Sequence, residues 1–65
     1  MFRNLQAEQA RMGLTNQEVA DLIGLSRISY ESKKKTGKFN VNECVKLCKL
    51  FHVNFEYLFD STISA

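Results

Sequence analysis

Apolar residues recur along this chain at spacings of three and four, and they do not alternate with polar residues over any strand-length window. That period is typical of amphipathic α-helices. The 65 residues include no proline and only three glycines, so few positions interrupt such helices. The pattern predicts one all-α domain over residues 1–60, built as a compact bundle of five short helices. Residues 61–65 show no pattern, and we expect a disordered tail there.

The first two helices have recognisable ends. The first is predicted over about 2–12, and Gly13 follows as a natural stop. Its inner face should hold Phe2, Leu5, Gln9 and Met12. The second helix starts at Thr15 with a capping box, in which that hydroxyl accepts from the amide of Glu18. Its apolar face should hold Val19, Ala20, Leu22 and Ile23.

Gly24 is predicted to separate the second helix from the third. Glycine adopts the left-handed conformation that ends many helices at little cost. Leu25 supplies an apolar contact just beyond it, and Ser26 is a good N-cap for a third helix over about 27–35. Asn40 and Glu43 then form a second capping box, which starts a helix that runs to about residue 51. Its inner face should hold Val41, Cys44, Val45, Cys48 and Phe51, with Leu47 beside them; Asn54 caps a final short helix, FEYLF.

Two helices joined by a tight glycine turn, the second one bounded by lysines, form a helix-turn-helix arrangement. Here Ala20 is expected at the helix crossing, Gly24 in the turn and Leu25 behind it. At 100° per residue, Tyr30 points inward between two lysines. The opposite face of the third helix holds Arg27, Ile28, Glu31, Ser32 and Lys35. Such a face suits the DNA major groove, where an apolar side chain meets a thymine methyl, arginine binds guanine, and glutamate can accept from a cytosine amino group.

The charge of the chain is concentrated in the same region. Net charge is only +2, but residues 27–38 contain five lysines and arginines against Glu31 alone. That segment carries +4 and the rest of the chain −2, which indicates a local contact with a polyanion. The structural alternative is a solvated lysine-rich turn.

Two stretches resemble Cro/repressor-type helix-turn-helix regulators, the XRE family: NLQAEQARMGLTNQEVADLIGLSR is similar to its opening, and NECVKLCKLFHVNFEYLF to its closing helices. The resemblance covers about residues 4–59 and is most specific at Ala20, Gly24, Leu25 and Ser26. It implies a lambda-repressor-like five-helix DNA-binding domain. The match is greatest with the short regulators of prophages and mobile elements.

The resemblance also implies roles for individual residues. By position, the base-reading candidates are Arg27, Ile28 and Ser32, and the chemistry of Glu31 adds it to that set. The resemblance implies that the start of the second helix contacts a phosphate, and helix N-termini favour anions in any case. The expected phosphate-binding residues are Asn16, Gln17, Ser26, Lys35 and Lys38.

The sequence departs from the family in two places. The family often pairs an arginine in the first helix with a glutamate at the end of the third, and Gln9 and Lys34 stand there. Because both halves of the ion pair are absent together, neither leaves an unpaired buried charge. Lys33 replaces an apolar residue, which predicts a loosely anchored end of the third helix.

Other chemistry finds little support in the residues. Cys44, Cys48 and His52 could line one helical face, but no CxxC pair occurs. They are interpreted as core cysteines and a capping histidine, with no metal or cofactor, and a metal-dependent sensor is the most distant alternative. Tyr30 is interpreted as a core residue and Tyr57 as a surface one. No catalytic Ser/His/Asp arrangement or phosphate-cradling glycine loop appears, so an enzyme is not expected.

The N-terminal residues MFRNLQAEQA lack the apolar core of a secretory signal. No run approaches the roughly 20 apolar residues of a membrane span. With two cysteines and no export signal, we expect a reduced, cytoplasmic protein without a membrane partner.

The leading hypothesis is a sequence-specific regulator of transcription that places its third helix in the major groove of a double-stranded DNA operator. A homodimer is expected, with half-sites about 34 Å apart and no small-molecule ligand. Phe55, Tyr57, Phe59 and the tail are the candidate dimer patch. The alternative is a protein-interaction module, antirepressor-like or antitoxin-like, that keeps the fold but has little DNA affinity. Glu31 on the exposed face and the low net charge support that alternative.

Overall fold

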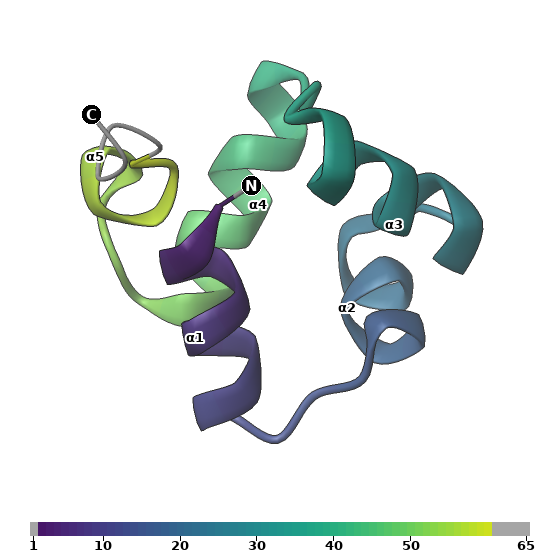
Figure 1. The fold of residues 1–65 in the computed structure, drawn as a ribbon, viewed down its shortest axis with the longest axis horizontal. Helices are drawn as coiled ribbons and strands as arrows, with labels where there is room; N and C mark the ends of the chain where they lie inside the picture. Colours follow the sequence, from purple (N-terminus) through teal and green to yellow (C-terminus); the bar gives the residue numbers. More distant parts are fainter. Residues whose placement is uncertain (1, 61–65) are drawn as a thin grey trace.

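The computed structural model describes residues 2–60, and all regular structure in that part of the chain is helical (Figure 1). The five helices are α1 (Arg3–Arg11), α2 (Asn16–Ile23), α3 (Arg27–Thr36), α4 (Val41–Phe51) and α5 (Phe55–Leu58). The all-α prediction is confirmed, and each predicted helix is present within two residues of its expected ends. The tail at 61–65 that was expected to be disordered lies outside the described residues.

Side-chain caps fix where the helices begin. The Thr15 hydroxyl accepts from the amide of Glu18 at 3.1 Å, and the carboxylate of Glu18 accepts from the amide of Thr15 at 2.8 Å. Asn40 and Glu43 make the same reciprocal pair at 2.8 and 3.0 Å. Both predicted capping boxes are therefore confirmed, and each satisfies two backbone groups that a helix start leaves unpaired.

Left-handed residues fix where α2 and α4 end. Gly24 has φ 82°, and the amide of Leu25 after it donates to the carbonyl of Ala20 at 2.8 Å. His52 closes α4 in the same way with φ 57°, and the next amide donates to the carbonyl of Cys48 at 3.2 Å. The predicted turn at Gly24 and the predicted capping role of His52 are both confirmed. Histidine bears a steric cost in this conformation that glycine avoids.

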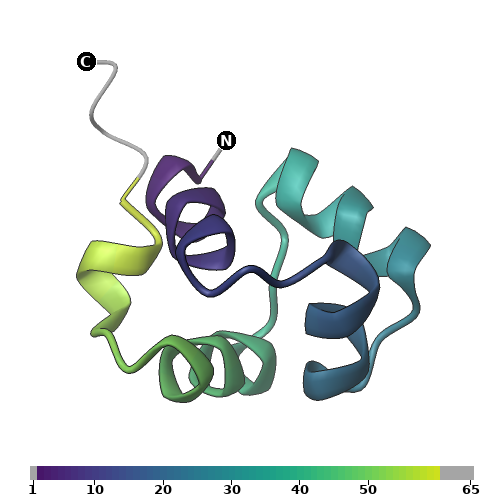
Figure 2. The same ribbon diagram turned by 90° about the horizontal axis from the view of Figure 1, so that it is seen from below.

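The helices surround one core. Helices α1 and α4 lie in the middle, α5 lies at one end, and the α2–α3 pair lies at the other (Figures 1 and 2). Every helix contributes to the buried cluster, which consists of Leu5, Val19, Ala20, Ile23, Tyr30, Leu47, Phe51 and Leu58. At one edge the rings of Phe2, Phe39 and Phe59 meet, with centroids 5.1–6.2 Å apart.

Four residues assigned to inner faces are exposed instead: Met12, Leu22, Val41 and Val45. In α4 the buried arc is centred on Leu47, which is fully buried. Val41 and Val45 lie more than 100° from Leu47 around the helix, so they face away from the core. Met12 is the C-cap of α1 and lies beyond its last full turn. Leu22 lies at the solvent side of α2, because Val19, Ala20 and Ile23 already fill the face toward the core.

Candidate functional site

Helices α2 and α3 pack closely against each other across the Gly24 turn. Ala20 is fully buried on α2, as its predicted place at the crossing requires, and Leu25 is half-buried behind the turn. A Cβ atom added to Gly24 would meet nothing closer than the Nζ atom of Lys46, at 3.8 Å. Glycine is therefore favoured at this position by the positive φ and not by lack of space.

The predicted division of α3 into two faces is confirmed. Tyr30 is fully buried, whereas Ile28 on the other side is 69 % exposed. The exposed face also holds Arg27, Ser32 and Lys35, with Glu31 partly covered among them. An isoleucine with this exposure contributes little to the core, and its interest lies in its neighbours Arg27 and Ser32, since a single exposed apolar side chain is common on protein surfaces.

A series of side-chain contacts on this face links Asn16, Glu31 and Arg27. The Nη1 atom of Arg27 lies 3.1 Å from both carboxylate oxygens of Glu31, one helical turn away. From the start of α2, Nδ2 of Asn16 donates to Oε2 of Glu31 at 2.9 Å. The hydrogen bond from Asn16, followed by that from Arg27, lowers the pKa of Glu31. Three residues expected to contact DNA separately are thus bound to one another. The four-residue spacing of Arg27 and Glu31 could have indicated their ion pair.

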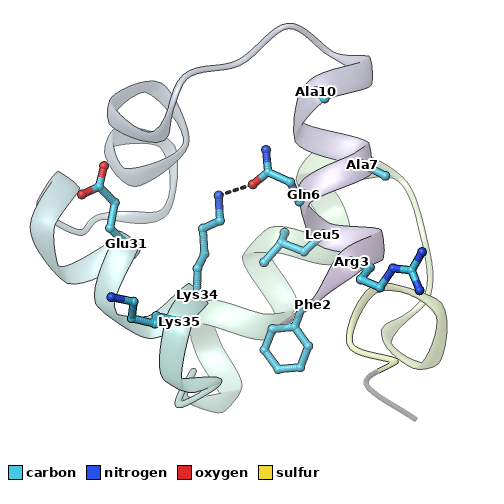
Figure 3. Close-up of a pocket in the computed structure, with 9 residues that line it drawn as sticks. All are labelled: Phe2, Arg3, Leu5, Gln6, Ala7, Ala10, Glu31, Lys34 and Lys35. Atoms are coloured by element: carbon cyan, nitrogen blue, oxygen red, sulfur yellow. Dashed lines mark hydrogen bonds between the residues drawn. The ribbon is translucent and has the colours of Figure 1, made fainter. Parts of the chain in front are cut away.

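Beside these contacts, the side chain of Lys34 reaches from α3 to α1 (Figure 3). Its Nζ atom donates to Gln6 at 2.6 Å, to Asn16 at 3.0 Å and to Gln9 at 3.2 Å. The same ammonium lies 5.1 Å from the ring centroid of Tyr30, a cation–π contact. Partial burial lowers the pKa of Lys34. An ammonium has three protons, so these three acceptors satisfy all of them.

Gln9 and Lys34 therefore meet where the resemblance led us to note a missing ion pair. Oε1 of Gln9 accepts from the Tyr30 hydroxyl at 2.8 Å as well as from Lys34, and its Nε2 donates to Asn16 at 2.9 Å. Gln9 is buried and all its polar atoms are paired. Gln9 and Lys34 therefore belong to a hydrogen-bond network that joins α1, α2 and α3.

The expectation of a loosely anchored end of α3 is wrong. Nζ of Lys33 lies 3.1 Å from Oε1 of Glu43, a buried carboxylate on α4. The amide of Gly37 then closes α3 on the carbonyl of Lys33 at 2.7 Å. A long lysine side chain can lie along an apolar surface while its charge reaches a partner, so it replaces the expected apolar residue.

The expected phosphate-binding residues differ in how free they are. The side-chain amide of Asn16 is already hydrogen-bonded within the network, and the side-chain amide of Gln17 donates to Asp21 at 2.8 Å. The Ser26 hydroxyl accepts from the amide of residue 29 at 3.1 Å as the N-cap of α3. Lys35 and Lys38 are exposed and form no ion pair within residues 2–60. Within the expected set, the two lysines are the side chains best placed for a new anion.

A groove of about 650 Å³, open to solvent, lies between α1 and α3 (Figure 3). Its apolar lining comes from Phe2, Leu5, Ala7 and Ala10, and its polar lining from Arg3, Gln6, Glu31, Lys34 and Lys35. The groove was not expected from the sequence, because nothing in the sequence indicates how far α1 lies from α3.

The candidate dimer patch on α5 is only partly exposed. Phe55 and Tyr57 are exposed, as predicted for Tyr57, whereas Phe59 packs on Phe2 with ring centroids 5.1 Å apart. The Tyr57 hydroxyl donates to the Glu8 carboxylate at 3.0 Å. Phe55, whose ring centroid lies 5.1 Å from that of Phe59, is therefore the most exposed apolar side chain of the patch within the described residues.

Cys44 is buried and Cys48 partly buried, both as free thiols, and burial raises the pKa of each. Within residues 2–60 no group of three His, Cys, Asp or Glu side chains is arranged to hold a metal ion. Over the same residues, no helix has the length and apolar character needed to cross a membrane.

Comparisons with family models, curated proteins and solved structures gave no significant match.

Proposed function

We propose that this chain is a sequence-specific DNA-binding regulator of transcription, with α2 and α3 acting as a lambda-repressor-like helix-turn-helix. The observation that carries the proposal is the exposed face of α3. Ile28 is 69 % exposed beside Arg27 and Ser32, while the opposite face is anchored by Tyr30. Apolar, guanidinium and hydroxyl groups on one face of a helix are the kinds of group that contact base edges in a major groove.

The anchoring of α3 supports the same function. Base recognition requires a helix held in a fixed orientation while its outer face stays free. Three contacts of α3 meet the first need: the buried Tyr30 with its hydrogen bond to Gln9, the Lys34 bridge to α1, and the Lys33–Glu43 pair. Lys35 and Lys38 near the end of α3 are free to meet phosphates on either side of the groove.

A homodimer on a palindromic or repeated operator belongs to the proposal. One recognition helix reads only a few base pairs, and two copies related by a two-fold axis double that length. The exposed side chain of Phe55 on α5 is the candidate centre of the contact. Helix α5 lies at the end of the molecule away from the α2–α3 pair (Figure 2). The resemblance to short prophage regulators fits a small repressor that acts in the cytoplasm.

Selection of bound sequences from a random duplex pool tests the proposal. The purified chain should enrich a common motif, and a duplex carrying it should bind far more tightly than a scrambled duplex at the same salt concentration. Recovery of a pool with no enriched motif would count against sequence-specific binding.

One observation favours a protein-interaction module instead. Glu31 holds Arg27 and Asn16, two of the groups expected to contact DNA. A module that has lost DNA affinity should elute from a heparin or random-duplex column at low salt, whereas a DNA-binding protein is retained to higher salt.

A further inference from the structure

Glu31 lies at a junction that its expected base-reading role does not explain. Its carboxylate accepts twice from Arg27 on α3 and once from Asn16 at the start of α2. Asn16 is in turn held by Gln9 and Lys34, both in the network behind α3. A continuous chain of hydrogen bonds therefore runs from the interior of the molecule to the guanidinium of Arg27 on its surface.

The geometry at Arg27 leaves part of its guanidinium free. Both contacts with Glu31 use Nη1 alone. The Nε and Nη2 groups remain unpaired within the described residues, and an arginine can present two such donors side by side to the O6 and N7 atoms of guanine. The carboxylate also offsets the positive charge of the Arg27 guanidinium, so Arg27 attracts an isolated phosphate less strongly than a free arginine does.

We infer that Glu31 is a positioning residue that sets the specificity of binding, holding Arg27 in a fixed orientation for a guanine and weakening its attraction for phosphates. The inference rests on the proposed DNA-binding function. Non-specific binding derives almost entirely from phosphate contacts, so a neutralised Arg27 lowers it. Binding to the operator gains from an arginine that is already oriented, because less side-chain freedom is lost on binding. Glu31 therefore strengthens binding to the operator and weakens non-specific binding.

The Glu31→Gln variant tests this role, because glutamine keeps the size of the side chain and an acceptor for Asn16. Glu56→Gln is the matched control, since Glu56 is an exposed glutamate on α5, away from α3. Affinities for the selected duplex and a scrambled duplex are measured across a salt series by fluorescence anisotropy. Circular dichroism and thermal melts check that both variants keep the helical fold.

For Glu31→Gln we expect tighter binding to the scrambled duplex and a log–log salt slope steeper by about one, because Arg27 becomes available to a phosphate. The ratio of operator affinity to scrambled affinity should fall about fivefold or more. Glu56→Gln should change both affinities equally and keep the ratio. An unchanged ratio in Glu31→Gln, or an equal fall in both variants, would overturn the inference.

If Glu31→Gln does not fold, a second variant tests the same role. Asn16→Ala keeps every charge and removes the hydrogen bond to Glu31, together with the acceptor for Gln9 and Lys34. Provided that its thermal melt shows a folded chain, it should lower the specificity ratio in the same direction. If the wild-type chain selects no duplex at all, the proposed function fails. Elution from heparin then tests separately whether Glu31 weakens the attraction of Arg27 for polyanions: Glu31→Gln should elute at higher salt than Glu56→Gln, and equal elution overturns that part of the inference.

Discussion

The phenol of Tyr30 donates a 2.8 Å hydrogen bond to Oε1 of Gln9, which ties the buried side of α3 to α1. The same oxygen accepts from Lys34, whose ammonium lies over the Tyr30 ring. Buried polar groups joined in this way are costly to leave unpaired, and when fully satisfied they specify one arrangement. The orientation of α3 therefore depends on a polar network as well as on apolar packing.

Alkaline pH should destabilise the fold through Tyr30. Burial raises the pKa of this phenol above its usual value, so the folded chain keeps a proton that the unfolded chain loses above about pH 10. Stability is therefore fully present below that pH and falls as pH rises, by up to about 1.4 kcal/mol per pH unit. The pKa of Lys34 is lowered, so just below the usual lysine pKa the folded chain holds fewer protons at this group than the unfolded chain does. In that range the contribution of Lys34 to stability rises with pH, opposite to that of Tyr30. Urea unfolding between pH 9 and about pH 12 measures the slope.

The Tyr30→Phe variant is the control for this prediction. It removes the titrating hydroxyl but keeps the buried ring, so its stability should fall less steeply above about pH 10. The pKa of Tyr57 is also raised, chiefly by its hydrogen bond to Glu8, and this contribution remains in the variant. The quantity that decides is the difference in slope between the two proteins. Equal slopes would show that Tyr30 ionises as freely as in the unfolded chain.

The Lys33→Met variant should be less stable by about 1–2 kcal/mol. Methionine matches the apolar stem of lysine but leaves the buried carboxylate of Glu43 with the backbone amide of Asn40 as its remaining partner within residues 2–60. The free energy of unfolding is measured by urea titration at neutral pH. The double variant Lys33→Met, Glu43→Gln should recover part of the loss, because the unpaired carboxylate is gone. A single variant as stable as wild type would mean that the pair does not anchor α3.

Features of the sequence that depend on neighbours in the chain were predictable. The capping boxes at Thr15 and Asn40 and the turn at Gly24 need only residues three or four positions apart, and all three are present. The two faces of α3 followed from its helical period, with Tyr30 as the only large side chain that could anchor the inner face.

The contacts between distant parts of the chain could not be predicted in the same way. Lys33 was interpreted as a weakness of α3 because its partner, Glu43, lies on another helix. Asn16 was expected at a phosphate, since a helix start favours anions, but its amide is used by Glu31 and Lys34. A polar side chain satisfies whichever partner the fold brings near, and sequence spacing carries no information on helix orientation.

The His52→Gly variant should be more stable than wild type by about 0.5–1 kcal/mol. His52 closes α4 with φ 57°, a conformation that glycine adopts without steric cost. For a domain of this size the melting temperature should rise by about 2–8 °C. His52→Ala is the control, because alanine shares the steric cost and should bring no gain. A melting temperature that rises equally in both variants would point to loss of the imidazole and not to backbone relief.

The Phe55→Glu variant should weaken self-association. Phe55 is exposed on α5, and a carboxylate at the centre of a small apolar contact would be buried without a partner. Sedimentation equilibrium with and without operator DNA measures the dimer. Val41→Glu, on an exposed surface of α4, is the comparison. If Val41→Glu disrupts the dimer and Phe55→Glu does not, the contact lies on α4 and the α5 assignment is wrong.

Arg27 and Lys35 should differ in how they affect DNA binding, although both carry one positive charge on the same face of α3. Arg27→Ala should cost about 1–3 kcal/mol on the selected duplex and relax the preference for one base pair, because a base-reading contact is lost. Lys35→Ala should weaken operator and scrambled duplexes alike and reduce the salt slope by about one, because a phosphate contact is lost. Lys49→Ala on α4 removes the same charge from another helix and should change neither quantity. Anisotropy titrations at several salt concentrations measure all three variants. Should Arg27→Ala and Lys35→Ala both bind every duplex as wild type does, α3 is not the recognition helix.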